Sequence, residues 1–162
     1  MEYFLLEEDN KLQNKLKLNF QNKDFDGEEP FIINLKTEQY AQFQDYIVGK
    51  DTFKYYFCVS EKFYEIISIY EDFKNTPFFI TDVERKIQKS YFKIDIKEIA
   101  CIEEKTNQTN KNITIYKDKV KDRYIFKIKY NTIEKLIVSI HLAENLLKSL
   151  PYGIKLIPVE LK

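Results

Sequence analysis

Short apolar segments with alternating side chains recur along the chain and predict a structure rich in strands. Runs of aromatic and β-branched residues bounded by polar or turn-forming residues are typical of strands. The segments with this pattern are EYFLLEE, PFIINL, FFITDV, SYFKIDI, EIACIE, NITIYK, RYIFKIKY and KLIVSI. The alternation is clearest in YIFKIKY, where apolar side chains fall on one face and Lys127 and Lys129 on the other. Because this pattern is typical of a half-buried antiparallel strand, we expect both lysines to face water.

Two segments have the helical period instead. After Ser60, a favourable N-cap residue, the apolar positions are spaced by three and four residues. These positions are Phe63, Ile66, Ile67, Tyr70 and Phe73. They predict an amphipathic helix near residues 60–73, which Thr76-Pro77 ends. Near the end of the chain, HLAENLLKSL predicts a short helix near residues 141–149.

The second helix is followed by a stop signal and a closing strand. Pro151-Tyr152-Gly153 cannot continue a helix, and IKLIPVEL then has a strand pattern. Pro158 indicates that this last strand lies at an edge or bulges there.

The pattern as a whole indicates one α+β domain spanning residues 1–162. A chain of 162 residues, 44% of them hydrophobic, is long enough to enclose its own core. The sequence has no repeat and no domain boundary, although the elements before about residue 50 are ambiguous beyond the first strand. We therefore expect a single domain with a mainly antiparallel sheet and the two helices above.

Composition and charge refine this expectation. The opening segment MEYFLLEEDN resembles neither a secretory signal nor a membrane span, so we expect a cytoplasmic protein without membrane contact. Cys58 and Cys101 lie in apolar runs and are predicted to be buried thiols without a redox role. The formal net charge is zero, but residues 1–81 carry about −6 and residues 82–162 about +6. This asymmetry either steers a charged partner or is cancelled by interleaving of the halves in the fold.

One pair of residues has the spacing of an acid–base or metal-binding pair. His141, the single histidine, lies three residues before Glu144, so on a helix the two side chains are neighbours. One helix supplies at most part of a metal site, which needs three or four ligands. Since neither a glycine-rich phosphate loop nor a nucleophile motif accompanies the pair, we expect His141 to be a local hydrogen-bonding group. We predict no catalytic residue, metal or cofactor, with an enzyme using His141 and Glu144 as the alternative.

A regulatory or nucleic-acid-binding domain is a second alternative. KDKVKDRYIFKIKY interleaves basic and aromatic residues, as a base-stacking surface does. Asp118 and Asp122 interrupt the positive charge, and the aromatic side chains alternate onto the expected core face. We therefore do not expect a nucleic acid as partner.

Four segments together resemble a known family. YFLLEED, FFITDVERKIQKSYFKIDIKEIACIEEKT, KDKVKDRYIFKIK and VSIHLAENLLKSLPYGIKLIPVEL are similar to bacterial immunity proteins of polymorphic-toxin systems, first catalogued as a domain of unknown function. The most specific positions are Leu142, Ala143, Glu144, Gly153 and Ile154. The resemblance implies an intracellular protein that binds the C-terminal effector domain of a cognate toxin and neutralises it without chemistry. It also implies that Glu144 and Gly153 are structural signature residues, which hold the last helix and its exit.

The first half of the chain offers a candidate contact surface for such a partner. An interface commonly combines aromatic anchors with charge complementary to the partner. The candidates are an acidic loop, Asp24, Asp26, Glu28 and Glu29, and three aromatic residues at helix-like spacing, Tyr40, Phe43 and Tyr46. If they form the interface, the toxin domain is basic; the alternative is that the aromatic side chains belong to the core and the acids are solvated.

Overall fold

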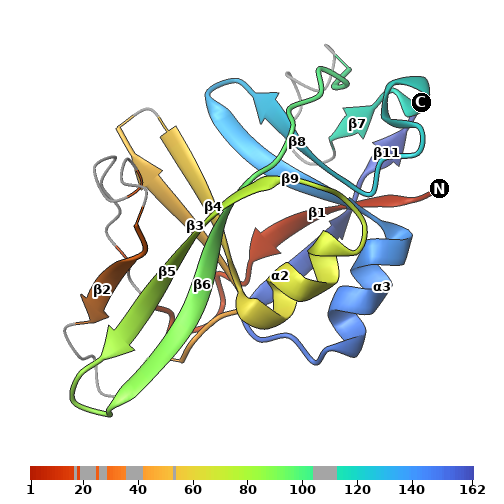
Figure 1. The fold of residues 1–162 in the computed structure, drawn as a ribbon. Helices are drawn as coiled ribbons and strands as arrows, with labels where there is room; N and C mark the ends of the chain where they lie inside the picture. The colour runs from red at the N-terminus through yellow and green to blue at the C-terminus, as the bar shows by residue number, and fades with distance from the viewer. Residues whose placement is uncertain (17, 19–24, 26–28, 36–41, 53, 104–112) are drawn as a thin grey trace.

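The computed structural model describes the chain except for residues 17, 19–24, 26–28, 36–41, 53 and 104–112. The described residues form an α+β fold with two larger sheets, a two-stranded ribbon and two α-helices (Figure 1). None of the helices in this part of the chain is long and apolar enough to cross a membrane.

The first sheet is wholly antiparallel. Its strand order is β10 (Ile154–Pro158), β1 (Tyr3–Glu8), β9 (Ile133–Ser139) and β8 (Ile125–Tyr130). The prediction for Pro158 is confirmed, because β10 is an edge strand, where the missing N–H of proline is tolerated. A ribbon of β7 (Thr114–Ile115) and β11 (Glu160–Leu161) pairs in parallel. The 3₁₀ turn η2 (Lys117–Val120) follows β7.

The second sheet contains the central part of the chain. Its order is β2 (Phe31–Leu35), β5 (Lys74–Asp82), β6 (Ile87–Asp95), β4 (Lys54–Ser60) and β3 (Tyr46–Asp51). Only the contact of β2 with β5 is parallel. The expectation of a mainly antiparallel α+β fold is therefore confirmed.

A hairpin, a serine and a helix follow one another twice in the chain. β3 and β4 lead into α2 (Glu61–Ser68), and β8 and β9 lead into α3 (Ile140–Lys148). Ser60 and Ser139 end the strands in extended conformation, and each hydroxyl oxygen accepts a bond from a helix N–H, that of Phe63 at 3.3 Å and that of Leu142 at 3.4 Å. A serine N-cap satisfies an N–H that the helix itself leaves unpaired, so each strand changes directly into a helix.

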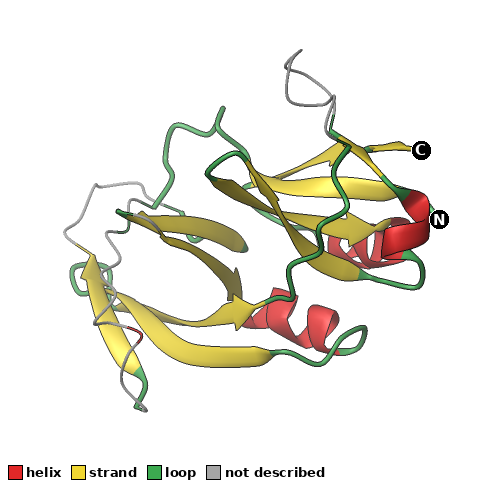
Figure 2. Cartoon of the chain, turned by 90° about the horizontal axis from the view of Figure 1, so that it is seen from above, coloured by secondary structure: helices red, strands yellow, loops and turns green. Residues whose placement is uncertain are grey.

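The two sheets and both helices share one hydrophobic cluster. It includes Val59 and Phe63 from the first unit, Val138 and Leu142 from the second, and Leu6 from β1. The helices pack beside the junction of the sheets, as Figures 1 and 2 show. They run antiparallel, since Lys62 at the start of α2 donates to the carbonyl of Ser149 after α3, at 3.1 Å.

A polar segment connects the sheets at the end of this cluster. The Asp45 carboxylate accepts from the Ser60 hydroxyl at 2.7 Å and from the Tyr152 N–H at 2.8 Å. The Gln44 side chain, fully buried, accepts from the Leu16 N–H at 2.9 Å. These bonds hold the start of α2 against the turn that follows α3.

Several element boundaries differ from the predictions. The first helix ends at Ser68, so Tyr70 and Phe73 lie beyond it, yet both still pack against the shared cluster. Both side chains reach the core although the backbone there is not helical. The apolar spacing therefore continued past the helix and made the predicted helix too long. Pro77 does not end the helix but lies inside β5. It is tolerated there because the pairing of β5 with β2 begins only at Phe78.

Two predicted strands are also different. EIACIE is not a strand; it has two isolated bridges, of Glu98 with Lys127 and of Ile102 with Ile115. The closing strand is divided at Val159 into β10 and β11, which belong to different sheets. The hairpin of β3 and β4 was missed, because neither strand alternates between apolar and polar side chains: Tyr56 to Val59 are all buried.

Candidate binding cleft

A cleft opens where β4 and β6 separate. Their pairing begins at Phe57 and Ile94, so the first three residues of β4 are not paired with β6. The chain after β6 crosses to the other sheet, where the Lys127 N–H donates to the Lys97 carbonyl and the Ile99 N–H donates to the Lys127 carbonyl, both at 2.9 Å. The space between β4 and this crossing segment is a cavity of about 460 Å³.

The cavity has an aromatic wall and many charged groups. Its aromatic residues are Tyr55, Tyr56, Phe57 and Phe73. Five lysines line it, Lys54, Lys74, Lys93, Lys97 and Lys127, with four carboxylates, Glu71, Asp72, Asp95 and Glu134.

Four ion pairs neutralise part of this charge, one of them between Lys127 and Glu98 at 3.8 Å. Lys93, whose side chain is 10% exposed, places Nζ 3.1 Å from Oδ1 of Asp95. Lys127 lies 3.1 Å from the Glu134 carboxylate, and Arg123 lies 3.2 Å from the Glu71 carboxylate. The buried ammonium of Lys93 is therefore paired, as burial of a charge requires.

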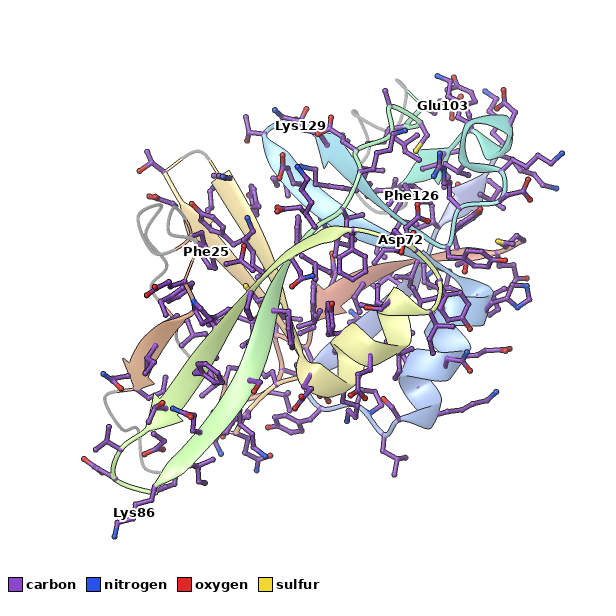
Figure 3. The ribbon with its side chains drawn as sticks, in the orientation of Figure 1. Phe25, Asp72, Lys86, Glu103, Phe126 and Lys129 are labelled. Carbon is purple, nitrogen blue, oxygen red and sulfur yellow. The ribbon has the colours of Figure 1, made fainter. Side chains whose placement is uncertain are left out.

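The remaining lysines are exposed and in excess. Among the described residues, no carboxylate lies within ion-pair distance of Lys54, Lys74 or Lys97. The one carboxylate of the cavity left outside the ion pairs is Asp72, in the turn between α2 and β5 (Figure 3).

A second hollow continues the cavity between the tips of the two hairpins. It has a volume of about 390 Å³ and includes Lys50 from β3 and Lys129 from β8. Tyr55 and Glu134 line both spaces, which we call together the cleft. We use "cleft lysines" for the five exposed lysines without a carboxylate partner in the described structure, Lys50, Lys54, Lys74, Lys97 and Lys129. Figure 1 shows the β3–β4 and β8–β9 hairpins with their tips toward the top of the view, and Figure 3 labels Lys129 near the tip of the β8–β9 hairpin.

Two lysines lie over aromatic rings at this site. Nζ of Lys50 is 5.2 Å from the centre of the Tyr55 ring, and Nζ of Lys54 is 5.5 Å from that of Tyr56. An ammonium over a ring face is attracted by the quadrupole of the ring. These contacts hold positive charge at the rim of the cleft.

The sequence prediction missed this site because its residues come from four separate stretches of the chain, near residues 50–57, 71–74, 93–97 and 125–134. The lysines of YIFKIKY were expected to face water, and Lys129 is exposed, whereas Lys127 is half-buried in the cleft. KDTFKYYF, with lysines flanking a turn and aromatic residues after it, is the local signal that points to the rim of the cleft.

The predicted contact residues of the first half are only partly described. Asp24, Asp26, Glu28 and Tyr40 lie outside the described residues. Glu29 is exposed, and Phe43 is half-buried against a core cluster beneath β5 and β6. Tyr46 is 1% exposed and begins β3 rather than continuing a helix. Its ring stacks on Phe57 within the shared cluster, so it is a core residue and not an accessible anchor.

His141 and Glu144 lie on the exposed side of α3. The hydroxyl of Tyr70 donates to the backbone carbonyl of His141 at 3.3 Å and leaves the imidazole out of the contact. Within the described ranges, no group of three or more His, Cys, Asp or Glu side chains is placed to hold a metal ion.

Both cysteines are fully buried and free, as predicted. Burial raises the pKa of the Cys58 thiol far above its ordinary value and that of Cys101 to about 11. Both groups are therefore protonated at neutral pH, and the thiolate needed for redox chemistry is disfavoured.

The positions that resemble the immunity-protein family lie in the first half of α3 and just after the turn that follows it. Leu142 and Ala143 are buried in the shared cluster, whereas Glu144 is exposed. Gly153 has φ of +81°, and Ile154 begins β10. No protein-family model matches the chain, and no curated protein matches it.

Proposed function

We propose that this protein is an immunity protein that binds the C-terminal effector domain of a cognate toxin in the cytoplasm and neutralises it by occupying its surface. The resemblance of the closing segment to that family supports the proposal. The structural observation that carries it is the cleft, because an open site with aromatic walls and a charged rim is suited to binding another protein.

Tyr55 lies at the centre of the proposed contact surface. Its half-buried side chain lines both parts of the cleft and is held by the ammonium of Lys50. Partly preordered aromatic side chains lose little conformational freedom on binding, and they dominate the binding energy of many interfaces.

The proposal expects the gene immediately upstream to encode the toxin, and the test is co-expression with the C-terminal domain of that gene product. We expect the wild-type chain to restore growth and to form a complex with the purified toxin domain. Tyr55→Ala should weaken that complex by about tenfold or more, as removal of a central aromatic anchor usually does.

Tyr116→Ala is the matched control. Tyr116 is also half-buried and carries a lysine over its ring, Lys119 at 5.0 Å, but it lies outside the cleft. Equal affinities for the two variants would remove the cleft from the interface. Absence of both complex and growth rescue with the wild-type chain would contradict the proposed function itself.

A further inference from the structure

We infer that the cleft binds an acidic, extended segment of the partner protein. The inference rests on the proposed function, in which the partner is the toxin domain, and it specifies the chemistry of the segment that the cleft recognises.

The excess of lysine at the cleft is the first reason. Each of the five cleft lysines is exposed, and Asp72 is the one described carboxylate of the cleft outside the ion pairs. Unpaired ammonium groups on facing walls repel one another, and a carboxylate placed between them relieves that repulsion. The rim is therefore complementary to several acidic side chains.

The positions of the lysines indicate an extended ligand. Lys54 and Lys97 lie on facing walls of the larger cavity, whereas Lys50 and Lys129 lie at the hairpin tips of its continuation. A single small anion can contact either the lysines of the larger cavity or those at the hairpin tips, but not both. A segment with acidic side chains at intervals reaches both, and its apolar atoms can contact Tyr55 between them.

The same residues disfavour a nucleic acid. Base stacking requires free aromatic faces. Here Lys50 covers one face of the Tyr55 ring, and Lys54 covers one face of the Tyr56 ring. A phosphate backbone carries a charge at every step. It would therefore also meet Asp72 and the paired Glu134 inside the cleft, whereas a polypeptide can place neutral residues there.

Fluorescence anisotropy with labelled peptides tests the inference on the full chain. The probes are three peptides of equal length in which Gly alternates with Glu, Gln or Lys, together with single-stranded oligothymidine. We expect the Glu peptide alone to bind, and binding to be lost near 1 M salt, where the screening length falls to about 3 Å.

Charge reversal locates the binding. Lys54→Glu combined with Lys97→Glu should weaken binding of the Glu peptide by about tenfold or more, since each replaced charge turns attraction into repulsion. The control, Lys117→Glu with Lys148→Glu, changes the net charge equally at exposed positions outside the cleft and should bind as the wild type does. If the reversed variant does not fold, as judged by circular dichroism, Lys54→Gln with Lys97→Gln replaces it, with a smaller expected loss.

The outcomes are separable from those of the proposed function. The inference is overturned if the Glu peptide does not bind, if both double variants bind it equally, or if oligothymidine binds more tightly. Preferential binding of the Lys peptide would also overturn it and would favour the acidic loop that contains Glu29. If the toxin is neutralised equally by wild type and cleft variant, the acidic-segment inference fails while the proposed function stands. If the wild type binds the Glu peptide through the cleft but never protects from the toxin, the proposed function fails while the cleft's preference for an acidic segment stands.

Discussion

Gly153 is the residue at which backbone conformation and packing both exclude a side chain. Its φ of +81° lies in the left-handed region, and a Cβ added there would be 2.7 Å from Cγ of Gln44. Gln44 has little room to move, because it is fully buried and bonded to Leu16. The turn predicted from sequence therefore needs glycine for two separate reasons.

Replacing Gly153 should destabilise the protein in proportion to the size of the new side chain. We expect Gly153→Ala to cost more than about 1 kcal/mol in the free energy of unfolding, because its Cβ meets both the strained φ and Gln44. Gly153→Val should cost more still, because its two methyl groups add volume at the same contact and a β-branched residue is least tolerant of positive φ. Urea denaturation measures both. A melting temperature equal to that of the wild type in the valine variant would show that the turn accepts another conformation.

His141 should be dispensable for the proposed function. Its side chain is exposed, and its contact with Tyr70 uses the carbonyl, which alanine retains. His141→Ala should leave toxin affinity and growth protection nearly unchanged and lower stability by no more than about 1 kcal/mol. A folded variant that no longer protects would revive the enzyme hypothesis for His141 and Glu144.

At the scale of the elements, the two hairpin–serine–helix units differ mainly in how their helices end. After α3, Leu150 has φ of +54° and is 86% exposed. Glycine is the usual residue at this position, because a Cβ is unfavourable in the left-handed region. The leucine therefore contributes strain and little buried area.

Glycine substitutions on either side of this boundary should have opposite effects. Leu150→Gly should raise the free energy of unfolding by roughly 0.5–1 kcal/mol, because relief of the left-handed leucine exceeds the added flexibility of the unfolded chain. Leu147→Gly, three residues earlier and inside α3, should lower it by about 1 kcal/mol or more. Thermal unfolding of the two variants checks this, and a decrease of similar size in both would contradict the assigned cap.

At the scale of the whole molecule, the stability of the junction between the sheets should depend on pH. Glu8, at the end of β1, has a pKa raised above its ordinary value of 4.5, with burial as the largest cause. Its contacts with Lys15 at 3.9 Å and with the Gln44 amide at 3.3 Å oppose the shift without cancelling it. The folded state holds the Glu8 proton more tightly than the unfolded chain does. Protonated Glu8 therefore contributes its full stabilisation at a pH below its pKa in the unfolded chain, and this stabilisation is lost as pH rises through its pKa in the folded protein.

Replacing the Glu8 carboxyl by a neutral amide should therefore increase the stability of the fold most at neutral pH. We expect Glu8→Gln to melt at a higher temperature than the wild type at pH 7, with the difference narrowing as pH falls below about 4.5. Glu144→Gln, at an exposed carboxylate on α3, is the control. A difference that grows on acidification would show that Lys15 and Gln44 outweigh the burial of Glu8.

The sequence by itself determined the local features of this protein. Ser60 as a helix cap, the inward face of β8 at Phe126 and Ile128, and the end of the last helix before Gly153 were predicted correctly, because each depends on neighbouring residues and on the conformations open to them. Burial of Cys58 and Cys101 was predicted from the apolar runs around them in the same way.

Only the tertiary structure decided which distant segments meet. For Tyr46 the helix-like spacing left both an accessible anchor and a core residue open, and its place in β3, paired with Val59 of β4, puts it in the core. The pairing of β4 with β6 ends at Phe57 and Ile94, and the crossing of the chain to β8 opens the cleft beside that end. Strand partners and registers depend on contacts between residues far apart in sequence, so a local pattern cannot show that lysines from both halves of the chain line one site.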